Sequence, residues 1–213
     1  MKKILAVCVI AASLACAALA AEPARLPEPA KSGGAALLDC LSARRAERTF
    51  SGETLSEQEL SDLLWAAGGV SSADGRLTYP TALDVRDIVI YAFTAAGAFR
   101  YDPAENALVP VVPGDCRAAT GMQPFVAGAS VNLVYVHDAS RWTEKKVPVG
   151  KILEFGCVHA GAAAQNASLF AAAKGWACVV RGSVDRVAVA RLLGLGEGQL
   201  VLLAQSIGPK PKQ

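Results

Sequence analysis

The sequence predicts a single mixed domain of helices and strands, and three observations lead to this prediction. Apolar residues make up 53% of the 213 residues and aromatic residues only 6%, which is typical of an alanine-rich folded protein rather than a disordered one. Segments with helical periodicity and short apolar, β-prone runs follow one another along the chain. The run 159–182 joins a helix, a glycine stop, a short strand and a glycine turn into one core unit.

The first twenty residues are predicted to be a secretory signal peptide and not part of this fold. Two lysines precede an uncharged run, residues 4–20, which closes on an Ala-Leu-Ala site with cleavage expected after Ala20. A retained membrane anchor is the alternative, but the run is only marginally long enough to span a bilayer. A lipoprotein signal ending at Cys16 is a weaker rival, because Ser13 stands where an apolar residue is expected.

Such a signal predicts export, unfolded, to the periplasm or out of the cell. Without the two lysines of the leader, the basic count falls from 21 to 19 and equals the 19 acidic residues. A neutral mature chain has no electrostatic basis for binding nucleic acid or an anionic membrane surface. The remaining stretch of about 190 residues is the size of one ordinary domain.

The domain is expected to start with a lead-in and two helices. Residues 21–34 contain three prolines and a glycine pair, which predicts an extended segment, either disordered or draped over the surface. The folded part, 35–210, then begins with a helix over 35–47, and Arg44, Arg45 and Arg48 gather near its end, as helix C-termini favour cations. Ser56 and Glu59 form a capping box for a second helix, which ends at a glycine pair.

Strands dominate the rest of the domain. Apolar runs predict strands over 87–94, 99–101, 108–112, 131–136, 176–180 and 200–207, the second and third of them paired as a hairpin. Residues 184–193 are predicted to form a helix capped by Gly194. One short helix is expected within 114–121, and a charged loop over 141–150.

The segment 158–173 is predicted to be a helix buried on all sides, because nearly all its residues are small or apolar. Gln165 and Asn166 are the exceptions. An unpaired buried amide costs about 1–3 kcal/mol, so these side chains are expected to find partners in core backbone or in a polar ligand.

Four cysteines remain after the leader, an even number in a compartment that permits disulfides: Cys40, Cys116, Cys157 and Cys178. Three pairings are open, and free buried thiols are an equal alternative. No spacing resembles CxxC, and with only His137 and His159 present a histidine metal cluster is not expected. Cys157 and His159 would form a thiol and base pair only in an extended segment; a buried thiol beside a histidine at the start of a helix is the simpler interpretation.

The common catalytic motifs are absent. The sequence contains no P-loop, HExxH, G-x-S-x-G or strand-linked dinucleotide fingerprint. The glycines of 194–198 follow a predicted helix, so they indicate a helix cap and turn rather than a cofactor loop. Any site must therefore be built from a distributed set of residues.

A distributed pattern of this kind resembles the FMN-dependent nitroreductase superfamily. Residues 44–50, RRAERTF, and the helix over 55–67 resemble that family's RRSxRxF and LxxLLWAAxG helices. Residues 79–86, YPTALDVR, stand where it has PSAxNxQ, and 161–169, GAAAQNASL, match its GxxxQNxxL helix. The nearest branch is that of the azoline-forming dehydrogenases, which shares the LPEP lead-in and the YDP turn. The resemblance runs from about residue 26 to residue 210.

The resemblance implies an α+β fold with a central, mostly antiparallel sheet flanked by helices, and a homodimer that binds FMN at each subunit interface. Guanidinium groups match phosphate in charge and fork geometry, which suits an arginine-rich phosphate site. The implied cofactor-binding residues are Arg44, Arg45 and Arg48 at the phosphate, Pro80, Thr81, Ala82, Asp84 and Arg86 at the flavin ring, the backbone of Arg181 and Gly182 at flavin N5, and Gln165, which with Asn166 fixes the helix and loops against the ring.

Two positions depart from the family pattern in a way that affects the ring contacts. Asp84 replaces an asparagine and Arg86 a glutamine, and an ionised aspartate only accepts hydrogen bonds where an amide also donates. Arg86 is expected either to donate to a flavin carbonyl or to pair with Asp84. The expected function is FMN-mediated two-electron redox of an unknown small molecule. The alternative is a degenerate nitroreductase fold without turnover, acting as a periplasmic binding or structural dimer.

Overall fold

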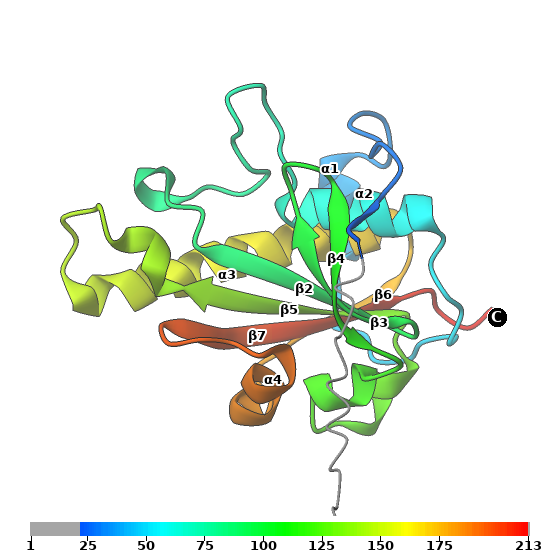
Figure 1. Cartoon of the computed structure of the whole chain (residues 1–213). Helices are drawn as coiled ribbons and strands as arrows, with labels where there is room; N and C mark the ends of the chain where they lie inside the picture. Colours follow the sequence, from blue (N-terminus) through cyan, green and yellow to red (C-terminus); the bar gives the residue numbers. More distant parts are fainter. Residues whose placement is uncertain (1–21, 213) are drawn as a thin grey trace, which may run out of the picture.

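The computed structural model of the chain describes residues 22–212 and shows a seven-stranded sheet with helices on both faces (Figure 1). Each neighbouring pair of strands in it is antiparallel, in the spatial order β1-β4-β3-β2-β5-β7-β6. The strands are β1 (Ala24–Arg25), β2 (Ile88–Thr94), β3 (Gly97–Asp102), β4 (Ala107–Pro113), β5 (Val131–Asp138), β6 (Ala177–Arg181) and β7 (Gln199–Gly208). The antiparallel α+β architecture implied by the resemblance is confirmed.

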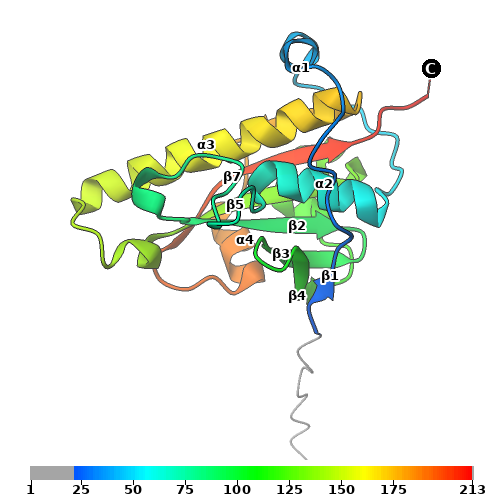
Figure 2. The ribbon, with the colours of Figure 1, turned by 90° about the horizontal axis from the view of Figure 1, so that it is seen from above.

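The helices α2 and α3 cover one face of the sheet, α1 packs against α3, and α4 covers the other face (Figures 1 and 2). The helices are α1 (Leu37–Ala43), α2 (Glu57–Gly68), α3 (Val149–Ala173) and α4 (Arg186–Leu193). The short 3-10 turns are η1 (Ala82–Asp84), η2 (Arg117–Thr120), η3 (Pro124–Gly128) and η4 (Ala139–Trp142). Figure 2 shows α3 crossing the sheet with α1 and α2 beside it, while α4 lies beneath. No helix within residues 22–212 is long and apolar enough to cross a membrane.

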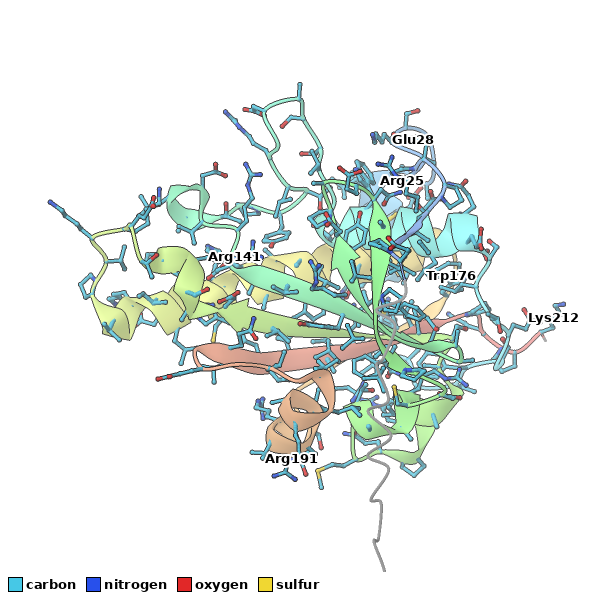
Figure 3. All side chains as sticks on the ribbon, viewed as in Figure 1. Arg25, Glu28, Arg141, Trp176, Arg191 and Lys212 are labelled. Carbon is cyan, nitrogen blue, oxygen red and sulfur yellow. The ribbon has the colours of Figure 1, made fainter. Side chains whose placement is uncertain are left out.

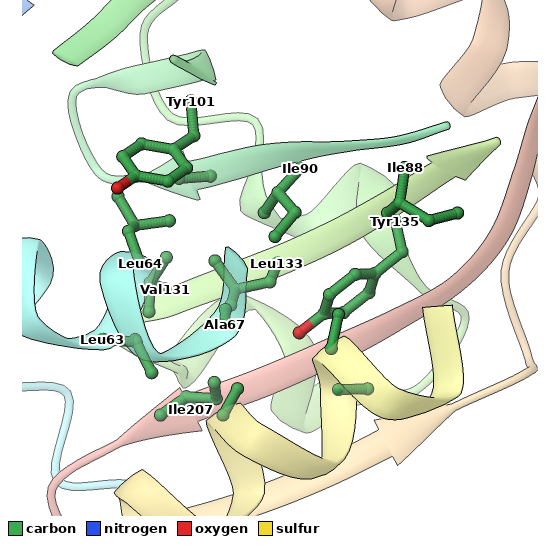
Figure 4. Packing of buried hydrophobic residues seen from close by; sticks show 14 of the residues in the cluster. Leu63, Leu64, Ala67, Ile88, Ile90, Tyr101, Val131, Leu133, Tyr135 and Ile207 are labelled. Atoms are coloured by element: carbon green, nitrogen blue, oxygen red, sulfur yellow. The ribbon is translucent and has the colours of Figure 1, made fainter. Parts of the chain in front are cut away.

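Two apolar layers hold the sheet and helices together. Alternate residues of a strand point to opposite faces, so Leu133 and Tyr135 of β5 pack toward α2 and α3, whereas Val134 and Val136 pack toward α4. Figure 4 shows the first layer, in which Leu63 and other residues of α2 meet the strands and α3. The predicted capping box of α2 is present, and Gly194 closes α4 in the left-handed conformation at φ 65°.

The lead-in lies draped along the surface. Its strand β1 pairs with β4, and the Leu26 N–H donates to the Asn106 carbonyl at 2.9 Å. The Ala30 N–H donates to a carboxylate oxygen of Asp62 at 2.8 Å, which fixes the lead-in to α2. The predicted signal peptide lies outside the described residues. The four cysteines within them are free, so the free-thiol alternative is the one the structure shows.

Two helix predictions need correction. The first helix ends at Ala43, not near residue 47, because the following segment is drawn out beside the sheet: the Glu47 N–H donates to the Cys178 carbonyl of β6 at 3.0 Å. The central helix begins at Val149, inside the predicted charged loop, and is not buried on all sides. Its outer face is exposed, with Val158 64% accessible. The short helix expected within 114–121 is present as the 3-10 turn η2, and a second 3-10 turn, η3, follows it outside that range.

Candidate cofactor site

Three cationic side chains meet in a small pocket next to β6. Arg44, Arg45 and Lys210 line it together with residues near the end of α3. The pocket has a volume of about 60 Å³, room for a few waters or one phosphate-sized anion and not for an aromatic ring system. Arg48 is exposed and does not line it, so the structure brings together two of the three predicted phosphate ligands and adds a third cation.

Backbone pairing brings these cations together. The Glu47 N–H binds the Cys178 carbonyl, and the Ser51 N–H donates to the Pro209 carbonyl at 2.9 Å, so the arginine segment runs beside the residues that follow β7. Lys210 lies there and forms an ion pair with Glu47 at 2.7 Å. Arg45 donates to the Ser42 carbonyl at 2.6 Å and thereby caps α1. Sequence reasoning missed Lys210, although two lysines spaced by prolines directly after the last strand were a visible signal.

The strand β6 presents a free edge beside this pocket. It is the outermost strand, and a strand residue points its N–H and C=O to the same edge, with the edge alternating along the chain. The Cys178 carbonyl faces away from the sheet, toward Glu47. By the alternation along the strand, the backbone N–H and C=O of Val180, and then the N–H of Gly182, also face outward, whereas the backbone groups of Arg181 face β7. A side chain at Gly182 would meet no atom within 4 Å, so this space is open in the single chain.

Arg181 occupies a buried network on the sheet face that α4 covers. Its guanidinium donates to the Thr120 carbonyl at 2.8 Å, to Ser206 Oγ at 3.0 Å and to Asn132 Oδ1 at 3.1 Å, with no carboxylate partner. Burial lowers the pKa of Arg181 to about 10. The Arg181 side chain therefore holds the sheet to η2 and η3, and a contact of its backbone with a flavin remains a prediction.

The loop 80–86 lies against the middle of α3, at His159. Pro80, Thr81 and Asp84 border an open cavity, and Ala82 begins the turn η1. Leu83 and Asp84 adopt φ of 54° and 55°, a left-handed conformation that is uncommon outside glycine. Of the two expectations for Arg86, the structure shows the pair with Asp84, with nitrogen to oxygen distances of 3.3 Å.

The two predicted halves of the flavin site are separated within one chain. The loop contacts α3 at His159, and the cationic pocket contacts it at Ser168 and Ala172. At 1.5 Å per residue this separation along the helix is on the order of 14–20 Å. One chain therefore does not assemble the phosphate and ring contacts around a single pocket.

A buried cluster that sequence reasoning missed fixes the loop to α3. Asp87 is fully buried before β2 and accepts hydrogen bonds from Nδ1 of His159 at 2.6 Å and from Nε1 of Trp142 at 2.9 Å. Nδ1 of His137 lies 3.0 Å from the same carboxylate without the alignment of a hydrogen bond. On its other side, Nε2 of His159 accepts the Ala82 N–H at 2.8 Å.

The geometry of this cluster sets the protonation of its members. A backbone N–H only donates, so Nε2 of His159 carries no proton and the neutral ring donates from Nδ1 to Asp87. Burial alone would raise the pKa of Asp87, but the contacts of His137, His159 and Trp142 outweigh it and hold the pKa below its usual range. The ionised Asp87 thus orients His159, and His159 holds the loop.

The amide pair of α3 divides into two roles. Asn166 is half-buried and donates to the Thr78 carbonyl at 2.9 Å, which fixes the helix to the segment before Pro80. Gln165 is exposed, so its predicted burial is wrong. The reason is that the outer face of α3 has no covering element in the single chain.

The remaining candidate chemistry is not assembled. Cys157 is exposed on α3, whereas His159 is buried beneath it, so the two form no thiol and base pair. Within residues 22–212 no group of three histidine, cysteine or acidic side chains is arranged to hold a metal ion.

Comparisons with known proteins bear on the whole fold. A family model described as the nitroreductase family matches residues 41–208. A crystal structure from Ralstonia eutropha JMP134, provisionally named a nitroreductase, is 35% identical, covers 92% of each chain and superposes with a TM-score of 0.84. A provisionally named nitroreductase of Methanocaldococcus jannaschii is 28% identical over 180 residues, 78% of this chain and 88% of its relative.

More distant structures share the fold alone. The NADPH:FMN oxidoreductase of Vibrio harveyi, solved with NAD⁺, is 21% identical with a TM-score of 0.63, over 83% of this chain and 69% of its own. The Escherichia coli microcin synthetase McbBCD complex is 19% identical with a TM-score of 0.67, over 77% of this chain and 68% of that one. With its family motifs matched along most of its length, the chain belongs to the nitroreductase family.

Proposed function

We propose that this protein is an exported FMN-dependent oxidoreductase that moves two electrons to or from a small molecule. The observation that carries the proposal is the convergence of Arg44, Arg45 and Lys210 beside the free edge of β6 in a nitroreductase-family fold. The FMN-binding oxidoreductase named above shares this fold and supports the choice of cofactor. Export rests on the leader sequence, residues 1–20.

The residues of the pocket fit a phosphate monoester. Three cationic side chains and one carboxylate, that of Glu47, line the pocket, so it carries a net positive charge. The Glu47 carboxylate forms an ion pair with Lys210. Within residues 22–212 no carboxylate pairs with Arg44 or Arg45, and arginine forks are well suited to phosphate oxygens. In this proposal the phosphate occupies the pocket, whose volume is too small for an aromatic ring system, and the ring of FMN lies outside it along the chain's surface.

This surface has the groups that a flavin ring requires. Bound FMN supplies the two-electron redox chemistry. Arg44 and Arg45 hold the phosphate, and the outward backbone of Val180 and the N–H of Gly182 offer hydrogen-bonding groups along the path leading away from it; the Gly182 carbonyl already accepts from the Val184 N–H. The open space at Gly182 lets a planar ring approach the backbone closely.

A second copy of the chain completes the site in this proposal. The loop 80–86 lies far from the cationic pocket of its own chain, so its ring contacts would reach the pocket of a partner. Large apolar side chains are exposed on α1 and on the outer face of α3, where they contribute no buried apolar surface to the stability of a monomer. They include Leu37 at 63%, Leu38 at 77% and Val158 at 64% accessibility. A homodimer would cover this surface.

Reconstitution with FMN tests the proposal. The purified protein should turn yellow with FMN, lose the flavin band on addition of dithionite, and regain it when a quinone or nitroaromatic acceptor is added. Arg44→Gln and Lys210→Gln should each weaken FMN binding about 10-fold or more, because a hydrogen bond to a charged group is worth about 1.5–3 kcal/mol. Arg191→Gln, on the exposed surface of α4, is the matched control and should bind FMN as the wild type does.

Two results would count against the proposal. A protein that binds no FMN at millimolar concentration would exclude the cofactor assignment. A protein that binds FMN but passes no electrons from it to any acceptor would instead support the degenerate fold without turnover.

A further inference from the structure

We propose that a second pocket, between β2, β3 and the loop that follows α2, binds a small organic carboxylate with an apolar body. The pocket has a volume of about 290 Å³, at the lower end of the range for small-molecule sites. It shares no residue with the Arg44 pocket, and of the residues assigned to the flavin ring only Arg86 lines it.

The pocket exists because the sheet opens at this point. The pairing of β2 with β3 stops at Tyr91 and Arg100, after which β3 continues along β4 only. The first residues of β2, Ile88 to Ile90, keep β5 as a partner on one side and face the pocket on the other. The segment from Val70 to Tyr79 forms the opposite wall.

Three arginines from separate elements give the pocket its charge. Arg86 precedes β2, Arg100 lies on β3, and Arg141 lies in η4, where it donates to the Arg86 carbonyl at 3.0 Å. Arg86 pairs with exposed Asp84 on the outer side, and the arginine ion pairs among residues 22–212 do not include Arg100. Arg141 is labelled in Figure 3, on the sheet face opposite α4.

One acidic side chain also lines the pocket but is already engaged. Asp102 accepts hydrogen bonds from the Ala104 and Glu105 N–H groups at 3.0 and 3.3 Å, which stabilise the turn between β3 and β4. It lies within 4 Å of no arginine nitrogen. Arg86 already pairs with Asp84 and Arg141 with Asp138, so the unpaired guanidinium that lines the pocket is that of Arg100.

A buried hydroxyl without a partner is the second observation that points to a ligand. Tyr79 is 3% exposed, lines the pocket, and its hydroxyl has no hydrogen-bond partner among the described residues. Burial, reinforced by Asp87, raises the pKa of Tyr79 despite Arg141 and Arg86, so the hydroxyl stays protonated and is able to donate. A buried hydroxyl left unpaired destabilises the fold, which a bound acceptor would correct.

These groups select one class of ligand. A carboxylate accepts both from a guanidinium fork and from a phenol. Leu77, Ile88 and Ile90 offer apolar walls that would pack against an aryl or short alkyl group. A bare inorganic anion would leave those walls uncovered, and a neutral amide would leave the arginine charge uncompensated.

Calorimetric titration with phenylacetate tests the site, with phenylacetamide as the neutral isostere and inorganic phosphate as the bare anion. Phenylacetate should bind saturably and at least about 10-fold more tightly than either. Arg100→Gln and Tyr79→Phe should each weaken it about 10-fold, and Arg191→Gln should not. In Figure 3 Arg191 lies on α4, on the opposite side of the sheet from Arg141. The Tyr79→Phe protein without ligand should melt at a higher temperature than the wild type, which also shows that the variant folds.

Three outcomes would overturn the inference. One is the absence of saturable phenylacetate binding by the wild type. Another is equal binding of phenylacetate and phenylacetamide, or equal binding by the wild type and Arg100→Gln. The last is displacement of phenylacetate by added FMN, which would place the carboxylate in the flavin site. Because the titration begins without FMN, the failure of flavin binding leaves this test intact.

Discussion

Replacing Asp87 with alanine should lower the free energy of unfolding by about 2–6 kcal/mol at pH 7, from two buried donors left without an acceptor. The substitution leaves the Nδ1–H of His159 and the Nε1–H of Trp142 buried without an acceptor. It also frees His159 to rotate, so the Ala82 N–H loses its partner and the loop loses its attachment to α3. Asp84→Ala is the matched control, because that side chain is 67% exposed and should change stability little. Urea unfolding followed by fluorescence measures both.

The pH dependence of this difference has a fixed sign. The folded-state pKa of Asp87 lies below its usual value, so its stabilisation is complete above the unfolded pKa of about 4 and is lost as pH falls through the folded value. The stability gap between wild type and Asp87→Ala should therefore be constant from about pH 7 to 5 and shrink below pH 4. A gap that stays constant at the lowest pH where the protein folds would show that Asp87 is not held ionised.

Replacing Arg181 with methionine should cost about 3 kcal/mol of stability. Methionine keeps an apolar body in the site but leaves the Thr120 carbonyl without its buried charged donor, whereas Asn132 Oδ1 keeps the hydrogen bond from the Ser206 hydroxyl. The gain from no longer desolvating an arginine offsets part of this cost. Arg191→Met, on the exposed side of α4, should change the unfolding midpoint little.

Gly121 provides an internal check on the Arg181 site. A side chain at Gly121 would overlap Nη1 of Arg181, so Gly121→Ala should destabilise the wild type. In the Arg181→Met background part of this clash is relieved. The change in unfolding free energy of the double variant should therefore differ from the sum of the two single changes by more than about 0.5 kcal/mol. Strict additivity would mean that the guanidinium does not occupy this position.

The fold was predictable because most of its elements carry local signals. The apolar runs of β2 and β5, the capping box of α2 and the glycine after α4 are each signals carried by a few residues. The end of α1 was not predictable, because the residues after Ala43 favour a helix locally and are extended only by their pairing with β6. Tertiary pairing overrides local propensity there.

The site was predictable in part. Arg44 and Arg45 followed from a motif, but Lys210 meets Glu47 across 163 residues and Asp87 meets His159 across 72, separations that no local pattern specifies. The exposure of Gln165 was missed for a related reason. The small apolar residues of this helix predict that its outer face is covered, but they do not reveal whether its own chain or a second copy covers it.

The phosphate pocket is tested most directly by titrating FMN and riboflavin, which lacks the phosphate, into the same protein and following flavin fluorescence. If Arg44, Arg45 and Lys210 hold the phosphate, FMN should bind about 100-fold more tightly than riboflavin, and Arg44→Gln should remove most of that preference while leaving riboflavin affinity unchanged. Equal affinity for the two flavins, or a preference that Arg44→Gln does not alter, would contradict the assignment of the pocket.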